Sequence, residues 1–457
     1  MRSASRDSDL LARLRWSAAT SAIQIEGAPS ADGGGRSIWD DFAETPGSVV
    51  DGSVPDVACD SYRHPEADVA LVAGLGIDRY RFSIPWARVQ PNGRGRGNPA
   101  ALDHYSRLVD ALLEAGVAPF PTLYHWEMPS AIEADGGWLV RDTAERFADY
   151  AAIVADRLGD RVRHWYTLNE PVMTTLEGYA IGTLAPAKNL LFHALPSVHH
   201  QLVAHAHAAG ALRVRGAVAV GLVNNHTYVR PRSDSREDAD AAVLYDTLHN
   251  MLFSEPLLAG AYPDLEALGI APMPVRGRDL ERIATSIDFY GLNFYNPTTV
   301  AAAGPDSAIP FEIVPTPAAP VTGFGPEWPI VPDALRALLI DLHARHPQMP
   351  PVIVAENGAS FPEPSTAERV DDPERIAYLE AHVAAVGEAM AAGVPVEEYT
   401  VWSLLDNWEW AHGYTQRFGL VHVDFATGER TPKASYDWYR DAIARARTTA
   451  SIEQADR

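Results

Sequence analysis

Val352-Ile-Val-Ala-Glu-Asn-Gly358 is an apolar run that follows Pro351 and delivers a carboxylate, Glu356, just before the glycine. A run of this kind, bounded by proline and glycine, is typical of a buried strand in a parallel sheet. Functional residues collect at the carboxyl ends of such strands. On its own, Glu356 is equally compatible with a carboxylate that caps the following turn.

A second stretch, Trp165-Tyr-Thr-Leu-Asn-Glu-Pro171, has the same character. It is strand-like and ends in an acid, Glu170, between Asn169 and Pro171. Two strands that each end in an acid predict a pair of carboxylates facing one pocket.

Similar strand-like segments alternate along the chain with segments that show helical periodicity. The eight predicted strands cover residues 14–19, 79–84, 119–125, 164–170, 217–225, 288–295, 351–356 and 399–406. Among the predicted helices are 143–158, 333–344 and 373–392. Strict alternation implies right-handed crossovers and a parallel sheet. Eight such units predict a single closed (β/α)8 TIM barrel.

Two long segments, 29–57 and 298–329, show no periodicity and are rich in Gly, Pro, Asp or Ser. We expect them to form loops at a functional rim or mobile segments. Without an internal repeat or linker, residues 1–457 are predicted to form one domain, with flexible tails at 1–10 and 444–457.

Composition narrows the class of protein. The chain has 60 acidic and 37 basic residues, a net charge of −23, which disfavours nucleic acid as a partner. The sequence shows no signal peptide and no apolar run of membrane-spanning length. A single cysteine, Cys59, excludes an intrachain disulfide and fits a reducing compartment, so we expect a cytoplasmic protein. Its oligomeric state is not determined by the sequence.

Polar and aromatic residues lie at or just beyond the predicted strand ends. They are Gln24, Arg81, His125, Trp126, Asn169, Glu170, Asn293, Tyr295, Glu356, Trp402, Glu409 and Trp410. Aromatic faces suit the C–H faces of a sugar ring, and amides, carboxylates and histidine suit its hydroxyl groups. Two acids flanking a glycosidic bond could then act as nucleophile and general acid/base.

The motifs in which these residues stand resemble those of family 1 glycoside hydrolases of the β-glucosidase type. They are Ser17 to Gly27, Arg81-Phe-Ser-Ile, Tyr124-His-Trp-Glu-Met-Pro129, Thr167-Leu-Asn-Glu-Pro171, Tyr290-Gly-Leu-Asn-Phe-Tyr295, Ala355-Glu-Asn-Gly358, Trp402 to Trp410, Arg417-Phe-Gly-Leu420 and Thr431-Pro-Lys433. Each motif is weak alone, but together they follow the family's order over nearly the whole chain.

The resemblance implies a role for each residue. Glu170 would be the acid/base and Glu356 the nucleophile, about 5 Å apart for retention, with Arg81 and Tyr295 supporting Glu356. The substrate-binding residues would be Gln24, His125, Trp126, Asn169, Asn293, Tyr295, Trp402, Glu409, Trp410 and Phe418. The expected substrate is a small β-glycoside or oligosaccharide, and no cofactor or metal is expected.

The resemblance also bears on substrate subclass. Relatives that act on 6-phosphorylated sugars replace the Glu-Trp pair and carry Lys and Tyr shortly after it. This chain keeps Glu409-Trp410 and has Gln416 and Phe418 there, which favours a non-phosphorylated sugar. Three motifs depart from the family pattern, at Glu127-Met128, in residues 60–65 and in residues 183–186, and could reshape the pocket's support or the aglycone rim.

Other functions receive less support. His199, His200, His205 and His207 crowd one predicted helix, but no two of them have the i, i+4 spacing of a zincin-type site. No Gly-x-Ser-x-Gly elbow indicates a serine hydrolase. A transglycosidase and a carbohydrate-binding protein without catalysis remain as alternatives, although both acids are present. Glucose, galactose and fucose are not distinguished by the sequence.

Overall fold

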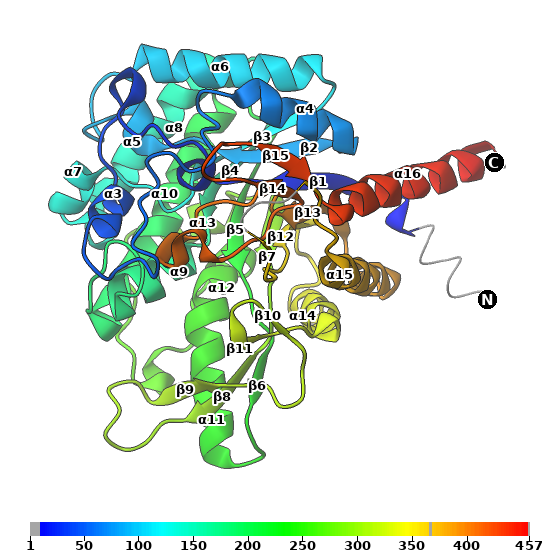
Figure 1. Cartoon of the computed structure of the whole chain (residues 1–457). Helices are drawn as coiled ribbons and strands as arrows, with labels where there is room; N and C mark the ends of the chain where they lie inside the picture. The colour runs from blue at the N-terminus through cyan, green and yellow to red at the C-terminus, as the bar shows by residue number, and fades with distance from the viewer. Residues whose placement is uncertain (1–9, 365–367, 456–457) are drawn as a thin grey trace.

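The computed structural model describes residues 10–364 and 368–455, and its centre is a closed barrel of eight parallel strands (Figure 1). The barrel strands are β1 (Arg15–Ala19), β2 (Arg79–Ser83), β3 (Ala118–Tyr124), β4 (His164–Asn169), β5 (Ala219–Asn225), β7 (Phe289–Asn293), β12 (Val352–Asn357) and β13 (Val396–Trp402). They pair in chain order, and β13 closes on β1. The predicted TIM barrel is confirmed.

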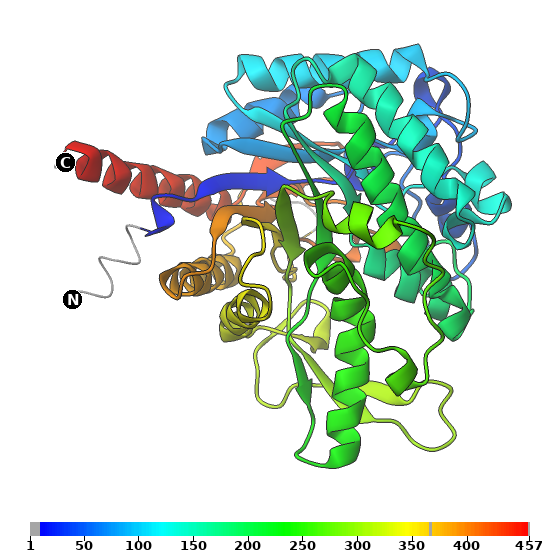
Figure 2. The same ribbon diagram turned by 180° about the vertical axis from the view of Figure 1, so that it is seen from behind.

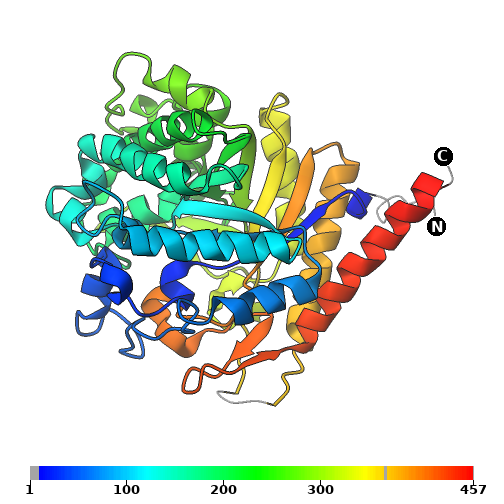
Figure 3. The same cartoon turned by 90° about the horizontal axis from the view of Figure 1, so that it is seen from above.

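Helices follow each barrel strand and surround the barrel (Figures 2 and 3). The longer ones are α4 (Pro65–Leu75), α6 (Pro99–Glu114), α8 (Asp142–Leu158), α10 (Pro196–Arg213), α11 (Arg236–Asp246), α12 (Leu252–Leu258), α14 (Pro332–Arg345), α15 (Pro373–Ala391) and α16 (Ala434–Ala455). Five of them begin with proline, whose fixed φ suits the first helical position. The predicted helices at 143–158, 333–344 and 373–392 correspond to α8, α14 and α15.

Short elements fill the connections. They are α2 (Ala22–Ile25), α3 (Ile38–Ala43), α5 (Trp86–Val89), α7 (Ser130–Ala134), α9 (Pro171–Met173) and α13 (Asp279–Ala284), the 3-10 turns η1 (Ala31–Gly33), η2 (Gly137–Leu139), η4 (Leu191–Ala194), η6 (Glu266–Leu268) and η7 (Trp410–Thr415), and the π-helical turns η3 (Thr174–Ile181) and η5 (Thr247–Met251).

The expectation that residues 29–57 and 298–329 lack regular structure is wrong. The first segment contains η1 and α3, and Ser37 and Asp40 form a capping box at the start of α3. The second contains β8 (Thr298–Ala302), β9 (Phe311–Val314), β10 (Val321–Thr322) and β11 (Gly325–Pro329). β8 and β9 join β6 (Val229–Pro231) in a small sheet beside α11, away from the barrel strands (Figure 1). β9 and β10 have only four and two residues, too few to show a period in sequence.

The register of the barrel aligns the polar strand ends. Asn293 on β7 pairs with Asn225 on β5 and with Glu356 on β12. Ala19 on β1 pairs with Trp402 at the end of β13. The predicted site residues on these strands therefore lie at one end of the barrel.

The last barrel strand begins three residues earlier than predicted. β13 starts at Val396 and includes two glutamates, which sequence patterns disfavour in a strand. Glu397 is exposed and contacts Arg15, whereas Glu398 is buried and accepts a hydrogen bond from Arg79 Nη1 at 2.9 Å. The Arg79 guanidinium also lies 5.0 Å from the Phe120 ring centroid. A charge pair inside the barrel thus supports a strand that the apolar pattern missed.

The C-terminal segment differs from the expected flexible tail. α16 continues to Ala455, so residues 444–455 are helical, and the helix extends outward from the barrel (Figures 1 and 3). Residues 1–9 of the predicted N-terminal tail lie outside the described residues, and the assignment of one domain to the whole chain stays a prediction. Among the helices of the described part, none is long and apolar enough to cross a membrane.

We predict that Glu398→Ala lowers the free energy of unfolding by about 3–5 kcal/mol, because it leaves the Arg79 charge buried without its partner. Glu397→Ala, next to it on β13, is the matched control. It removes an exposed pair with Arg15 and should cost less than about 1 kcal/mol. Chemical denaturation measures both. Equal losses would contradict a stabilising role for the buried pair.

Candidate active site

A cavity of about 470 Å³ opens at the carboxyl ends of the barrel strands. The predicted site residues that line it are His125, Trp126, Asn169, Glu170, Tyr295, Glu356, Trp402, Glu409, Trp410 and Phe418. Three others, Gln24, Arg81 and Asn293, lie directly behind this lining and hydrogen bond to it. The structure thus gathers every predicted site residue around one cavity.

Glu356 is the penultimate residue of β12, and each of its carboxylate oxygens receives a donor. Arg81 Nη1 lies 2.5 Å from Oε1, and the Tyr295 hydroxyl donates to Oε2 at 2.6 Å. The Arg81 and Glu356 side chains are 1% and 3% exposed. A cation and a hydroxyl donor thus hold both oxygens of Glu356 in fixed positions.

Glu170 follows β4 directly, with its backbone in the left-handed region at φ 46°. Its N–H donates to Val223 O on β5 at 2.8 Å, which fixes the turn. Burial, and then the negative charge of Glu356, raise the pKa of Glu170 to about 8. The two carboxyl groups therefore differ in their surroundings, and Glu170 is the one held in the protonated form near neutral pH.

Amide side chains connect the two acids. Arg81 Nη2 donates to Asn169 Oδ1 at 2.7 Å, and Asn293 Nδ2 donates to the same oxygen at 3.1 Å and to Glu170 Oε1 at 2.7 Å. Arginine only donates, so Asn169 Oδ1 must accept, and the orientations of both amides follow. Asn169 Nδ2 then donates to His125 Nε2 at 3.0 Å. Burial and the Arg81 charge keep the pKa of His125 well below its usual range, so the ring is neutral.

Gln24 and Glu409 form a polar pair at the side of the cavity. Gln24, on α2, donates from Nε2 to Asn407 Oδ1 at 2.9 Å and to Glu409 Oε2 at 3.2 Å. Burial, and then the charge of Glu356, raise the pKa of Glu409 to about 8. A protonated Glu409 can both donate and accept a hydrogen bond, as sugar hydroxyl groups require.

Several indole and phenyl rings wall the cavity. Trp126 and Trp410 lie 4.4 Å apart between ring centroids, and Trp126 Nε1 donates to Asn169 O at 3.1 Å. Trp402 packs with Phe418 and Ala19, and its ring centroid lies 5.7 Å from that of His125. The indole rings present flat apolar faces beside the polar groups, a combination suited to a sugar ring.

Sequence reasoning missed several residues of the cavity wall. The additional members of its lining include Met173, Glu177, Asn225, Tyr245, His249, Ile313, Phe324, Glu327, Trp328 and His412. Asn225 could have been found, because it ends the fifth predicted strand. Most of the others lie in the segments that connect the barrel strands and helices. The spacing of apolar residues in these segments does not predict which side chains face the cavity.

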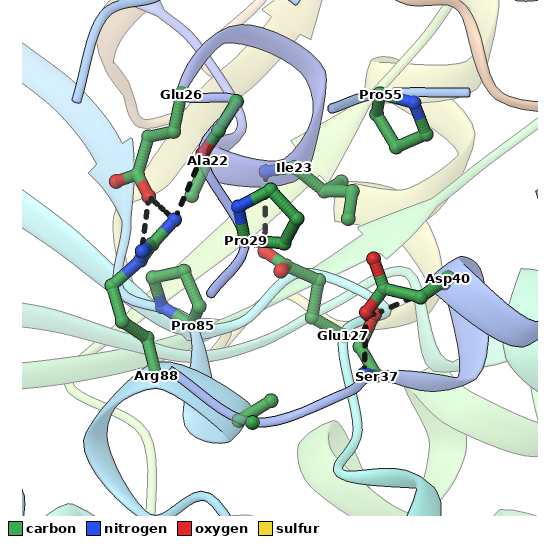
Figure 4. A pocket seen from close by; sticks show the side chains of 13 residues that line it. Ala22, Ile23, Glu26, Pro29, Ser37, Asp40, Pro55, Pro85, Arg88 and Glu127 are labelled. Carbon is green, nitrogen blue, oxygen red and sulfur yellow. Dashed lines mark hydrogen bonds and ion pairs between the residues drawn. The ribbon is translucent and has the colours of Figure 1, made fainter. Parts of the chain in front are cut away.

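Glu127, a departure from the family pattern, lies beside a second, smaller cavity lined in part by Glu26, Asp40 and Arg88 (Figure 4). Glu127 Oε2 accepts a hydrogen bond from Ile23 N at 3.2 Å, next to Gln24 in α2. Arg88 pairs with Glu26, whereas burial and the charge of Glu26 raise the pKa of Glu127 well above its usual range. Glu127 therefore supports the segment that carries Gln24.

Members of two groups of possible metal ligands bond to other side chains or carbonyl groups of the protein. Among the described residues, Glu363, Asp406 and His422 converge, but Lys433 Nζ lies 2.6 Å from Glu363 and 2.8 Å from Asp406. The histidines of α10 bond to separate partners: His199 to Asp279, His200 to Trp138 O and His205 to Thr167. Lys433 therefore lies within the first group, and the three named histidines of α10 have different partners.

Cys59 is buried and free. Its thiol donates to Asp406 O at 3.1 Å, and burial raises its pKa well above the usual value. These surroundings suppress the reactive thiolate form.

A parallel barrel whose strand ends bring together two carboxyl groups with opposed surroundings, in a cavity walled by indole rings, defines the class of (β/α)8-barrel glycoside hydrolases. Within that class, the chain belongs to glycosyl hydrolase family 1, whose family model matches residues 8–448.

Individual relatives agree with this family. The chain is 45% identical over 442 residues to thermostable β-glucosidase B of Thermobispora bispora, covering 94% of this chain and 89% of that protein. It is 41% identical over 435 residues to β-glucosidase A of Thermotoga maritima, covering 94% and 96%. The crystal structure of a psychrophilic β-glucosidase from Micrococcus antarcticus superimposes with a TM-score of 0.91 at 41% identity, covering 95% and 97%.

We predict that Glu127→Gln stabilises the protein increasingly as pH rises. A carboxyl group whose pKa is raised on folding contributes stability that is present below its unfolded pKa, about 4.5, and is lost as pH rises through its folded pKa. Glutamine does not titrate and keeps an acceptor for Ile23 N. Thermal unfolding at pH 5 and pH 7.5 measures the difference from wild type.

The matched control is Glu114→Gln on the exposed surface of α6, which should show a nearly constant small difference. A Glu127→Gln difference that stays constant or shrinks with pH would contradict the raised pKa.

Proposed function

We propose that the protein is a retaining β-glucosidase. It hydrolyses terminal, non-reducing, non-phosphorylated β-D-glucosyl residues of oligosaccharides and of aryl or alkyl glycosides. The observation that carries the proposal is the contrast within one cavity: Glu356 receives a donor on each oxygen, while burial and the charge of Glu356 raise the pKa of Glu170 to about 8. The names of the relatives described above support the same activity.

In the first step, Glu356 attacks the anomeric carbon as the glycosidic bond breaks. Glu170, protonated below about pH 8, gives its proton to the leaving oxygen, and a covalent glycosyl ester forms on Glu356. Both donors to Glu356, Arg81 and Tyr295, belong to the protein. The carboxylate is therefore held in place before the substrate binds. The proposed mechanism requires the two carboxyl groups to lie about 5 Å apart.

In the second step, the roles of the acid and the base reverse. Ester formation removes the negative charge of Glu356, and with it one of the two causes that raise the pKa of Glu170. Glu170, which lost its proton in the first step, therefore stays ionised. It then acts as the base that accepts a proton from the attacking water. The electrostatic coupling between the two groups thus drives the change of protonation state that the cycle requires.

Unpaired buried atoms around Glu170 and Glu356 supply the glycone contacts. Gln24 Oε1, His125 Nδ1 and Asn293 Oδ1 are buried without hydrogen-bond partners among the described residues. Buried polar atoms of this kind call for a partner, and sugar hydroxyl groups provide both donors and acceptors. We assign hydroxyl contacts to Gln24, His125, Asn169 and Asn293, and to the Glu409 and Trp410 pair. Trp402 is the platform below the ring, with Trp126, Tyr295 and Phe418 completing the wall.

The charge of the lining supports a non-phosphorylated sugar. The described residues that line the cavity include no lysine or arginine, and Arg81 behind Glu356 is committed to that carboxylate and to Asn169. Gln416 accepts a hydrogen bond from Ser360 and carries no charge. A phosphate would therefore enter a site with Glu170, Glu356 and Glu409 and without a cation to compensate it.

The same proposal includes secondary activity on β-galactosides and β-fucosides, because these sugars share most hydroxyl contacts with glucose. Alcohols and sugars compete with water for the glycosyl ester, so transglycosylation accompanies hydrolysis. We assign the protein to the cytoplasm on its single buried cysteine, and we treat the whole chain as one domain that requires no cofactor.

Two variants separate the roles of the acids. Glu356→Gln should lose turnover of aryl β-glucosides by several orders of magnitude, because no nucleophile remains. Glu170→Ala should lose about 10²–10⁴-fold in kcat/KM for glucosides with poor leaving groups and much less for 2,4-dinitrophenyl glucoside, which needs little protonation. Added azide should accelerate turnover of the activated substrate and give the β-glucosyl azide.

Glu327→Ala is the control, because Glu327 is an exposed carboxylate at the edge of the same cavity. It should leave the dependence on the leaving group unchanged. An equal loss for all leaving groups in Glu170→Ala would contradict the acid role, and full activity in Glu356→Gln would contradict the nucleophile.

A further inference from the structure

Glu170 receives two amide donors on the same carboxylate oxygen. Asn293 Nδ2 lies 2.7 Å and Asn225 Nδ2 lies 2.8 Å from Oε1. The Asn293 amide is oriented by its bond to Asn169 Oδ1, as described above. The Asn225 amide has a different partner, which lies outside the barrel strands.

That partner is His249, in the π-helical turn η5, whose Nε2 lies 3.1 Å from Asn225 Oδ1. On the other side of the imidazole, the Tyr245 hydroxyl lies 3.3 Å from Nδ1, with the two rings 5.4 Å apart. Burial lowers the pKa of His249 to about 4, so the ring is neutral near pH 7 and carries one N–H.

The direction of each hydrogen bond follows from chemistry. An amide oxygen only accepts, so Nε2 of His249 must carry the proton, and Nδ1 then accepts from the Tyr245 hydroxyl. With Oδ1 of Asn225 turned toward His249, its Nδ2 faces Glu170. The hydrogen bonds therefore run in one direction, from Tyr245 through His249 and Asn225 to Oε1 of Glu170. We call this series of hydrogen bonds the relay.

We propose that His249, supported by Tyr245, is a positioning residue for the reaction, whose Nε2–H orients the Asn225 amide as a donor to Glu170. This inference rests on the acid/base role proposed for Glu170. His249 is not assigned a proton transfer or a contact with the reacting atoms.

The surrounding structure holds the relay in place. Asn250, the next residue of η5, accepts from His226 Nδ1 at 2.9 Å and donates to Thr227 O at 2.9 Å. These bonds attach the π-helical turn to the segment that follows β5. Tyr245 packs against Phe311 of β9, with ring centroids 5.2 Å apart. The small sheet that includes β8 and β9, inserted after the sixth barrel strand, thus contacts the outer end of the relay, and π-helical turns occur often at functional sites.

The relay has two effects on the acid/base. Two donors on Oε1 leave Oε2 as the oxygen that carries the proton toward the leaving group. The Asn225 bond also favours the ionised form of Glu170 and so opposes the effects of burial and of Glu356 on its pKa. Loss of His249 frees the amide to rotate, which removes this donor and raises the pKa of Glu170.

Other titratable groups near the relay are unchanged in the test. Glu356, Arg81, Tyr295 and Glu409 act on Glu170 from the other elements of the cavity. Near the outer end, the charge of Glu177 in η3 acts on Tyr245, and His226 lies close enough to feel a charge on His249. Because the variants retain all of these groups, a difference between them isolates the relay.

The experiment measures the pH dependence of kcat/KM for an aryl β-glucoside, whose alkaline limb reports the acid in the free enzyme. In wild type the limb should fall near pH 8. His249→Leu should move it upward by about half to one pH unit, the size of one lost neutral hydrogen bond. His249→Gln places an amide donor near the position of Nε2 and should restore the wild-type limb. Tyr245→Phe should give a smaller upward shift.

The outcomes separate this inference from the proposed function. A purely structural role of His249 would lower kcat/KM at every pH and leave the limb in place, and that result would overturn the relay. An upward shift in His249→Gln as large as in His249→Leu would also overturn it. If Glu170→Gln retained the alkaline limb, the acid assignment itself would fail. Loss of the limb in Glu170→Gln together with an unmoved limb in His249→Leu would refute the relay alone.

Discussion

The site depends on one buried cation. Arg81 is 1% exposed and bonds to Glu356, to Asn169 and to the carbonyl of Ala355. A guanidinium at this depth is stable only with a carboxylate and further acceptors around it, so β2 and β12 must lie next to the same part of the barrel interior. The pair therefore fixes the position of Glu356 and sets the orientations of the amides around it. Once Arg81 donates to Asn169, that residue must donate to His125 and must accept from Asn293, which in turn donates to Glu170.

The surroundings of Glu170 and Glu356 differ because only Glu356 bonds to this cation. Glu356 bonds to Arg81 directly, whereas Glu170 receives only neutral amide donors and is affected by the charge of Glu356. The same charge acts on Glu409, so the state of Glu356 influences two carboxyl groups around the cavity. Ester formation on Glu356 would lower the pKa of both at once. In the proposed mechanism, a change in one covalent bond would in this way act on the proposed acid/base and on a proposed hydroxyl-binding group.

Much of this arrangement could be predicted from residue patterns, for physical reasons. Barrel strands are buried on both faces, so runs such as residues 352–356 are visible in sequence, and parallel strands place their polar ends together. The start of β13 was predicted wrongly because Arg79 stabilises Glu398 inside the barrel. The two residues are 319 positions apart, so no local sequence pattern reveals their pairing. His249 could not be found because its role depends on a π-helical turn and on Asn225, 24 positions away. Asn225 itself lay at a predicted strand end and was overlooked. The raised pKa values arise from burial, which composition does not reveal.

The most direct test of the account is the anomeric configuration of the first product. A Glu356 nucleophile and a Glu170 acid/base require two successive inversions at the anomeric carbon. Proton NMR during the first minutes of hydrolysis of an aryl β-glucoside, before mutarotation, distinguishes the anomers. The account predicts that β-glucose appears first and that the α-anomer grows in later. Initial release of α-glucose would contradict it, because a single displacement by water would then be the reaction.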